Sequence, residues 1–212
     1  LQLSHGVDVK LPLELTLGAS GFYHDYRDLS DLAATCGAGV AQCSIADRAD
    51  GRAYGAELLV RRSFSNRVGG LVSYTLSRSE RVVSGERILA DFDRTHVVNA
   101  VLGVKLPRRW HVGARLVWYS GRPHSLISLD DPEKPNEATL IGKRNALRRD
   151  AFYRLDLRVE KRWIVAKRAW VSLVIEMLNA TFRSEIVDFD CRVAEVLGSS
   201  AGLECGGQKI GP

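Results

Sequence analysis

Residues that could do chemistry occur throughout the chain, but their spacing matches no catalytic or metal-binding pattern. The five histidines are dispersed, and two of them fall on apolar strand faces, which favours structural or interfacial roles over metal ligation. The pairs Asp91/Asp93 and Asp188/Asp190 have the two-residue spacing of a calcium loop without its glycine turn or terminal glutamate. The sequence therefore predicts no enzyme, no metal site and no cofactor.

The four cysteines fall in two local pairs, Cys36 with Cys43 and Cys191 with Cys205. Neither pair has the C-x-x-C spacing of a zinc site, and both lie in loop-like segments. We interpret the pairs as disulfides formed in an oxidising compartment such as a periplasm. Four reduced thiols are the alternative, because spacing alone does not fix the redox state.

Apolar and charged residues alternate along residues 153–163, which predicts a strand with two unlike faces. Tyr153, Leu155, Leu157 and Val159 form one set, and the residues between them are charged. Successive side chains of a strand point to opposite sides of its sheet. In a soluble sandwich the charged face would contact solvent. In an outer-membrane barrel the apolar face would contact lipid, and the charged face would line a wet lumen.

The same period of two recurs along the chain and predicts an all-β, antiparallel fold of about eight strands. The strands are expected at residues 1–11, 13–23, 52–64, 68–77, 95–106, 110–119, 153–163 and 170–177. Polar, Gly-rich or Pro-rich stretches between them are expected to be loops. Residues 183–212 are also expected to be loop-like, with no closing strand.

The predicted connections alternate in length, being short after the first, third, fifth and seventh strands and long after the others. Soluble β-sandwiches mix hairpins with crossovers and rarely sort their loops in this way. Outer-membrane barrels have short periplasmic turns and long extracellular loops. The pattern therefore favours an up-and-down transmembrane β-barrel portion that takes in the whole of residues 1–212.

Aromatic residues gather at two levels along the predicted strands, as the interfacial girdles of a barrel require. Those toward the long loops are Tyr23, Tyr54, Tyr74, Trp118 and Tyr153. Those beside the short turns are Phe64, Trp110, Trp163 and Trp170.

Composition limits the classes of partner that the chain is expected to have. The chain has 212 residues, of which 45% are hydrophobic, and no apolar run is long enough for a transmembrane helix, although barrel strands need none. An export signal is expected upstream of residue 1, since the first residues do not form one. The net charge of +5 is scattered along the chain, so we expect no nucleic-acid partner.

If the fold is a barrel, the free-energy cost of placing charges in lipid requires the strand charges to face inward. An arginine turned toward lipid at the bilayer midplane costs roughly 2–4 kcal/mol. We therefore expect nine charges to face the lumen: Glu57, Arg61, Arg115, Arg154, Asp156, Arg158, Glu160, Arg162 and Glu176. Lys161 is the exception on the lipid side, and its position near a short turn allows it to snorkel to the interface.

Several segments, in order, resemble the C-terminal barrel region of TonB-dependent outer-membrane receptors. They are Gly51-Arg52-Ala53-Tyr54-Gly55-Ala56-Glu57, Val72-Ser73-Tyr74-Thr75-Leu76-Ser77-Arg78-Ser79, Asp93-Arg94-Thr95-His96-Val97-Val98-Asn99, Ser120-Gly121-Arg122-Pro123, Tyr153-Arg154-Leu155-Asp156-Leu157-Arg158 and Glu176-Met177-Leu178-Asn179. The similarity covers most of residues 1–190. The family's plug domain, its TonB-contacting segment, its earlier strands and its closing strand are not in this sequence, which resembles eight strands of a 22-stranded barrel.

The resemblance implies TonB-coupled uptake of a scarce nutrient, often a ferric siderophore, in the outer membrane of a Gram-negative bacterium. Outer-membrane lipid, the TonB complex acting through a plug, and the nutrient chelate are the implied partners. The nine inward charges would contact the plug or line a substrate path, or else form a cross-strand ladder that hydrates the lumen. The basic loop residues would attract an anionic chelate or lipopolysaccharide, or are solvated charge: Arg122, His124, Lys134, Lys143, Arg144, Arg148 and Arg149.

Two other functions remain open. A complete eight-stranded barrel would serve as an anchor or adhesin, and it requires the first strand to pair with the eighth. A soluble periplasmic β-protein that binds carbohydrate would bury Leu155, Leu157, Leu173 and Ile175 in a dry core. Two free edges and an exposed apolar face would contradict both.

Overall fold

The computed structural model describes residues 1–30, 48–65, 67–83, 85–128, 139–166, 169–194 and 202–210. Side chains are described in these ranges except at 127–128, 139–141, 187–194 and 202–210. Regular structure in them consists of β-strands and two short 3-10 turns, which confirms the predicted all-β class.

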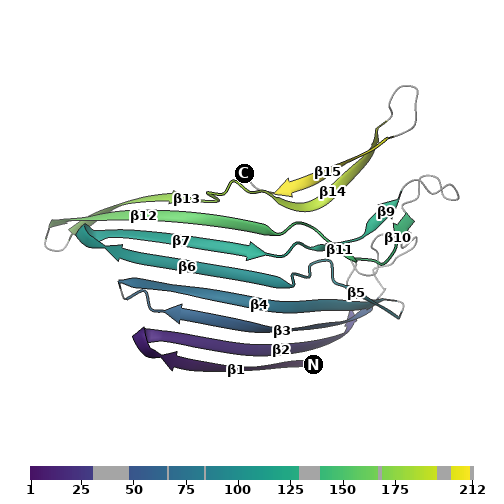
Figure 1. The fold of residues 1–212 in the computed structure, drawn as a ribbon, viewed down its shortest axis with the longest axis horizontal. Helices are drawn as coiled ribbons and strands as arrows, with labels where there is room; N and C mark the ends of the chain where they lie inside the picture. The colour runs from purple at the N-terminus through teal and green to yellow at the C-terminus, as the bar shows by residue number, and fades with distance from the viewer. Residues whose placement is uncertain are drawn as a thin grey trace.

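Eight long strands form one antiparallel sheet in the order in which they occur along the chain (Figure 1). They are β1 (Gln2–Leu11), β2 (Leu15–Leu29), β3 (Ala49–Arg62), β4 (Val68–Val83), β6 (His96–Leu106), β7 (Trp110–Tyr119), β12 (Phe152–Ala166) and β13 (Ala169–Met177). The ninth, β5 (Glu86–Leu89), folds back on β4. The eight predicted strands and their up-and-down order are confirmed.

Connections are sorted by length, with short turns at the left end of Figure 1 and the loops at the right end. Two of the turns are η1 (Pro12–Glu14) and η2 (Pro107–Arg109). Each places two consecutive non-glycine residues at φ near +60°, namely Leu13 and Glu14 in η1 and Arg108 and Arg109 in η2. Two successive positive φ angles belong to the tight hairpin turns whose twist matches that of the flanking strands.

The loop end carries three small two-stranded sheets. β8 (Pro123–His124) pairs with β11 (Leu147–Arg148), and β9 (Leu126–Ser128) pairs with β10 (Thr139–Ile141). β14 (Glu185–Ala194) and β15 (Gly202–Ile210) form an antiparallel hairpin. The expectation that residues 183–212 are loop-like was therefore wrong, because residues 187–193 alternate apolar and polar side chains as a strand does.

The sheet is open. β1 and β13 are its two edges, the lowest and highest strands of this sheet in Figure 1, and they do not pair with each other within the described strands. The complete eight-stranded barrel, which needs that pairing, is not what the described residues form. Both edges leave a row of backbone N–H and C=O groups available to further strands.

Strand register puts most of the large apolar residues of the eight strands on one side of the sheet, although Leu59, Leu71 and Val101 lie on the other. Leu58, for example, lies opposite Ala19 of β2 and Tyr74 of β4, and Leu116 lies opposite Ala100 of β6 and Leu155 of β12. A one-residue slip in any pair would turn that strand's apolar set to the other side. We call this side the apolar face and the opposite side the charged face.

Candidate functional site

The apolar face is uncovered. Large side chains on it are widely exposed, for example Leu58 at 51%, Leu102 at 51% and Ile175 at 62%. Leu157 and Leu173, which a soluble fold would bury, are 38% and 54% exposed. Among the side chains described, the buried hydrophobic ones are only Ala49, Ile88 and Ala90. No dry core therefore forms on this side of the sheet in the described part of the chain.

Aromatic residues mark the loop end of the apolar face. Tyr74, Trp118 and Tyr153 lie in one cross-strand row, with Val98 between the first two. Tyr23 lies opposite Tyr54 on the neighbouring strands, and their stacked rings are 6.5 Å apart. All five predicted loop-side aromatics are on this face.

The turn end of the apolar face has a smaller aromatic group than the sequence indicated. Trp110 and Trp163 lie there, with Lys161 directly opposite Trp110. Trp170 is on the charged face instead, opposite Ile164, where the Arg162 guanidinium stacks on its ring at 4.4 Å. Trp170 therefore lies beside its turn, at the predicted level, but on the face opposite Val171, as the alternation along its strand predicts.

Phe64 lies in the turn after β3, at the predicted turn-side level, but on the other face. A side-chain carbon placed on Gly103 would lie 3.1 Å from the Phe64 ring, and Gly103 is on the charged face. The ring therefore covers a glycine on the side of the sheet opposite Trp110.

The nine predicted inward charges all lie on the charged face, as the strand register shows. Six of them form a ladder of ion pairs. Arg154 Nε is 2.7 Å from Asp156 Oδ1, and Arg162 Nη2 is 3.0 Å from Glu160 Oε1. Arg158 joins two carboxylates, at 3.3 Å from Glu160 and 2.5 Å from Glu176. The ladder links β12 to β13.

The other three inward charges lie outside this ladder. Arg115 stands opposite Asp156 in the register of β7 and β12. Glu57 and Arg61 belong to β3, where they lie opposite Thr75 and Leu71 of β4. The strands β4, β6 and β7 separate them from the ladder on β12. The structure brings together the charges of β12 and β13, but not those of β3.

Asp156 also organises the end of β13. Its Oδ1 accepts a hydrogen bond of 2.8 Å from the backbone N–H of Asn179, which is only 6% exposed. The Asn179 amide donates to the Arg183 carbonyl at 2.9 Å and accepts from Thr181 and the Arg183 N–H. The Asn179-Ala180-Thr181 segment is therefore a strand-ending turn.

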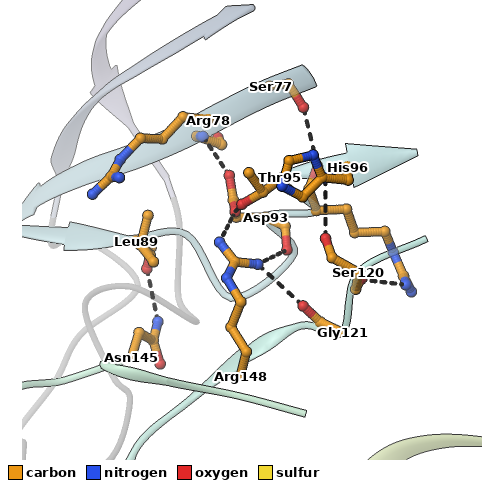
Figure 2. Close-up of polar contacts among 12 residues, drawn as sticks. Ser77, Arg78, Leu89, Asp93, Thr95, His96, Ser120, Gly121, Asn145 and Arg148 are labelled. Carbon is orange, nitrogen blue, oxygen red and sulfur yellow. Dashed lines mark hydrogen bonds and ion pairs between the residues drawn. The ribbon is translucent and has the colours of Figure 1, made fainter. Parts of the chain in front are cut away.

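A buried carboxylate joins the strand ends to the loops (Figure 2). Asp93 is 2% exposed and accepts hydrogen bonds from the Ser79 N–H at 2.6 Å and the Thr95 hydroxyl at 3.2 Å. Arg148, which follows the longest internal loop, forms an ion pair with Asp93 at 2.5 Å and donates to the Gly121 carbonyl at 3.1 Å. We call this group the Asp93 network.

Two further residues fit tightly around the Asp93 network. The Asn145 amide donates to the Leu89 carbonyl at 2.7 Å and to Asp91. A side-chain carbon on Gly121 would lie 1.9 Å from the Arg149 carbonyl oxygen, so only glycine fits there. The motif residues Asp93 and Gly121 thus hold the described loop residues 121–128 and 145–149 against the sheet.

Glu185, the first residue of β14, attaches the terminal hairpin to the sheet. Its carboxylate accepts hydrogen bonds of 2.6 Å from Arg94 and of 2.6 Å from the Tyr119 hydroxyl. The Arg94 guanidinium lies 3.7 Å from the Tyr119 ring centre. Burial opposes ionisation of Glu185, but the hydrogen bonds from Arg94 and Tyr119 outweigh burial and lower its pKa.

The predicted basic loop residues have unlike surroundings. Arg148 is held by Asp93 and so is not a free ligand for an anion. Burial, with the nearby Arg149 charge, lowers the pKa of His124. Lys134 lies outside the described residues.

The described residues include only one of the two predicted cysteine pairs. Cys36 and Cys43 lie outside the described residues. The backbones of Cys191 and Cys205 are directly opposite each other in the β14–β15 hairpin. A disulfide between them stays a prediction.

Comparison with other proteins gives no family for this chain, since no family model, curated protein or solved structure matches it. Within the described ranges, no helix has the length and apolar character to cross a membrane. No group of three or more His, Cys, Asp or Glu side chains is placed to hold a metal ion there.

Proposed function

We propose that the chain is part of the wall of an outer-membrane β-barrel of the TonB-dependent receptor type. The observation that carries this proposal is the continuous apolar face of eight strands, which is exposed and bounded by aromatic residues at both ends. In water such a face would favour aggregation, whereas lipid chains cover it without any second protein layer.

The charged face and the open edges support the same proposal. A water-filled lumen hydrates the ladder of Arg158, Glu160 and Glu176 at little cost. Further strands at the edges β1 and β13 satisfy the free backbone groups, which cannot stay unpaired in lipid. A wider barrel then has space for a plug on its charged side.

Nitroxide labels on adjacent residues test this orientation. Leu58 is on the apolar face and Leu59 on the charged face of the same strand. In membranes that contain the complete gene product, a label at Leu58→Cys should collide with oxygen and be shielded from a water-soluble nickel chelate. A label at Leu59→Cys should not show that preference for oxygen. Equal nickel access at both positions would contradict a lipid-facing side.

Energy-coupled uptake of a scarce nutrient, such as a ferric siderophore, is the activity we propose for the receptor. The ordered motifs from Gly51 to Asn179 support it. Deletion of the gene should abolish growth on one iron chelate under iron limitation, and dissipation of the proton gradient should stop the uptake. Normal growth of the deletion strain on every iron chelate and other scarce nutrient supplied would contradict the proposal.

A further inference from the structure

A basic hollow lies at the turn end of the sheet, where Lys161 and Trp163 reach it from the apolar face and Arg162 and Ile164 from the charged face. It has a volume of about 530 Å³ and is lined by Arg108, Arg109, Lys161, Arg162, Trp163 and Ile164. Four of these residues are cationic, and no carboxylate is among the described residues that line the hollow. Because the cations of η2 and β12 converge there, the local potential favours an anion.

The surroundings of Lys161 indicate where an anion would bind in this hollow. It is the one charged residue of β12 on the apolar face, opposite Trp110. Its ammonium lies 5.0 Å from the Trp110 ring centre and 5.9 Å from that of Trp163, and it donates a hydrogen bond to the Arg108 carbonyl. An ammonium has three donors, so two remain for another partner.

We infer that this hollow binds the phosphate group of an anionic phospholipid headgroup. The inference rests on the proposed function, since an apolar face in lipid puts Trp110 and Trp163 at headgroup depth. Lys161 lies between the two rings, where a lipid phosphate lies beside the acyl chains that cover Leu157 and Leu173. The exposed guanidinium groups of Arg108 and Arg109 then contact the same phosphate from the turn.

Native mass spectrometry of the complete gene product in neutral detergent tests the inference. We expect phosphatidylglycerol to bind at least roughly fivefold more tightly than phosphatidylcholine, since one cation near an anionic surface has about that effect. The triple variant Lys161→Gln, Arg108→Gln, Arg109→Gln should lose the preference.

Lys105→Gln is the matched control, because Lys105 is a cation at the same end of the sheet on the charged face, bound to the Ser65 carbonyl at 2.8 Å. This variant should keep the preference for phosphatidylglycerol. Displacement of the lipid by millimolar inorganic phosphate would assign the site to free phosphate.

Two outcomes would overturn the inference. They are equal binding of the two lipids by the unaltered protein, or a preference that survives in the triple variant. Both leave the proposed function standing as long as the protein needs detergent. A protein that is monomeric without detergent and binds neither lipid would contradict the proposed function itself.

Discussion

The two faces of the sheet are built from the same strands, but their side chains differ in whether they find partners within the chain. On the charged face, Arg158 is bound by Glu160 and Glu176, so these charges have partners within the chain. On the apolar face, Leu58 and Ile175 have no protein layer over them in the described part of the chain. The difference indicates that the ladder charges are satisfied within the chain, whereas the apolar face depends on its surroundings.

The largest effect should come from a charge placed on the apolar face. In lipid vesicles, Leu58→Arg should lower the free energy of unfolding by about 2–4 kcal/mol, because the guanidinium would face hydrocarbon. Leu59→Arg should cost less than about 1 kcal/mol, because the neighbouring position faces the charged side. Denaturant titration measures both values. Equal losses would remove the distinction between the two faces.

The loop end should respond next most strongly. Asp93→Ala leaves the Ser79 N–H and Arg148 without their buried partner, and should cost about 1–3 kcal/mol of unfolding free energy. Hydrogen exchange should also rise in residues 121–128 and 145–149, which the network holds. Thr95→Val, which removes only the long 3.2 Å bond, is the milder control. Unchanged exchange in the Asp93 variant would show that other contacts anchor the loop.

The ion-pair ladder should contribute less than either. Glu160→Gln removes one carboxylate that pairs with both Arg158 and Arg162, yet we expect a smaller loss of unfolding free energy than in the Asp93 variant, because water screens these pairs. The loss should shrink further in high salt. A loss as large as that of Leu58→Arg would mean that the charged face is dry and covered.

Acid should release the terminal hairpin with the smallest change in overall stability. The pKa of Glu185 is lowered in the folded protein, so its contribution is present above the ordinary glutamate pKa and is lost as the pH falls through the lowered value. Hydrogen exchange in residues 185–194 should therefore rise in acid. Glu185→Gln should show fast exchange at neutral pH with no further acid step. If neither acid nor Glu185→Gln alters hydrogen exchange in the hairpin, other contacts hold it against the sheet.

The strands and their faces were predictable, because a period of two fixes which side chains share a face. It follows that Leu58 and Tyr74 share a face, since the opposite parity would mix apolar and charged residues. The Asp93 network was not predictable, because Asp93 and Arg148 are 55 residues apart and lie in segments without periodicity. The β14–β15 hairpin had a signal in residues 187–193 that reading this region as a loop overlooked.

Solubility without detergent tests the central claim most directly. The exposed apolar face should make the protein aggregate in aqueous buffer, and detergent micelles or lipid vesicles should restore a monodisperse, strand-rich protein. Sedimentation velocity with circular dichroism measures both states. A folded monomer at high concentration in buffer alone would contradict the claim that this face lies against lipid.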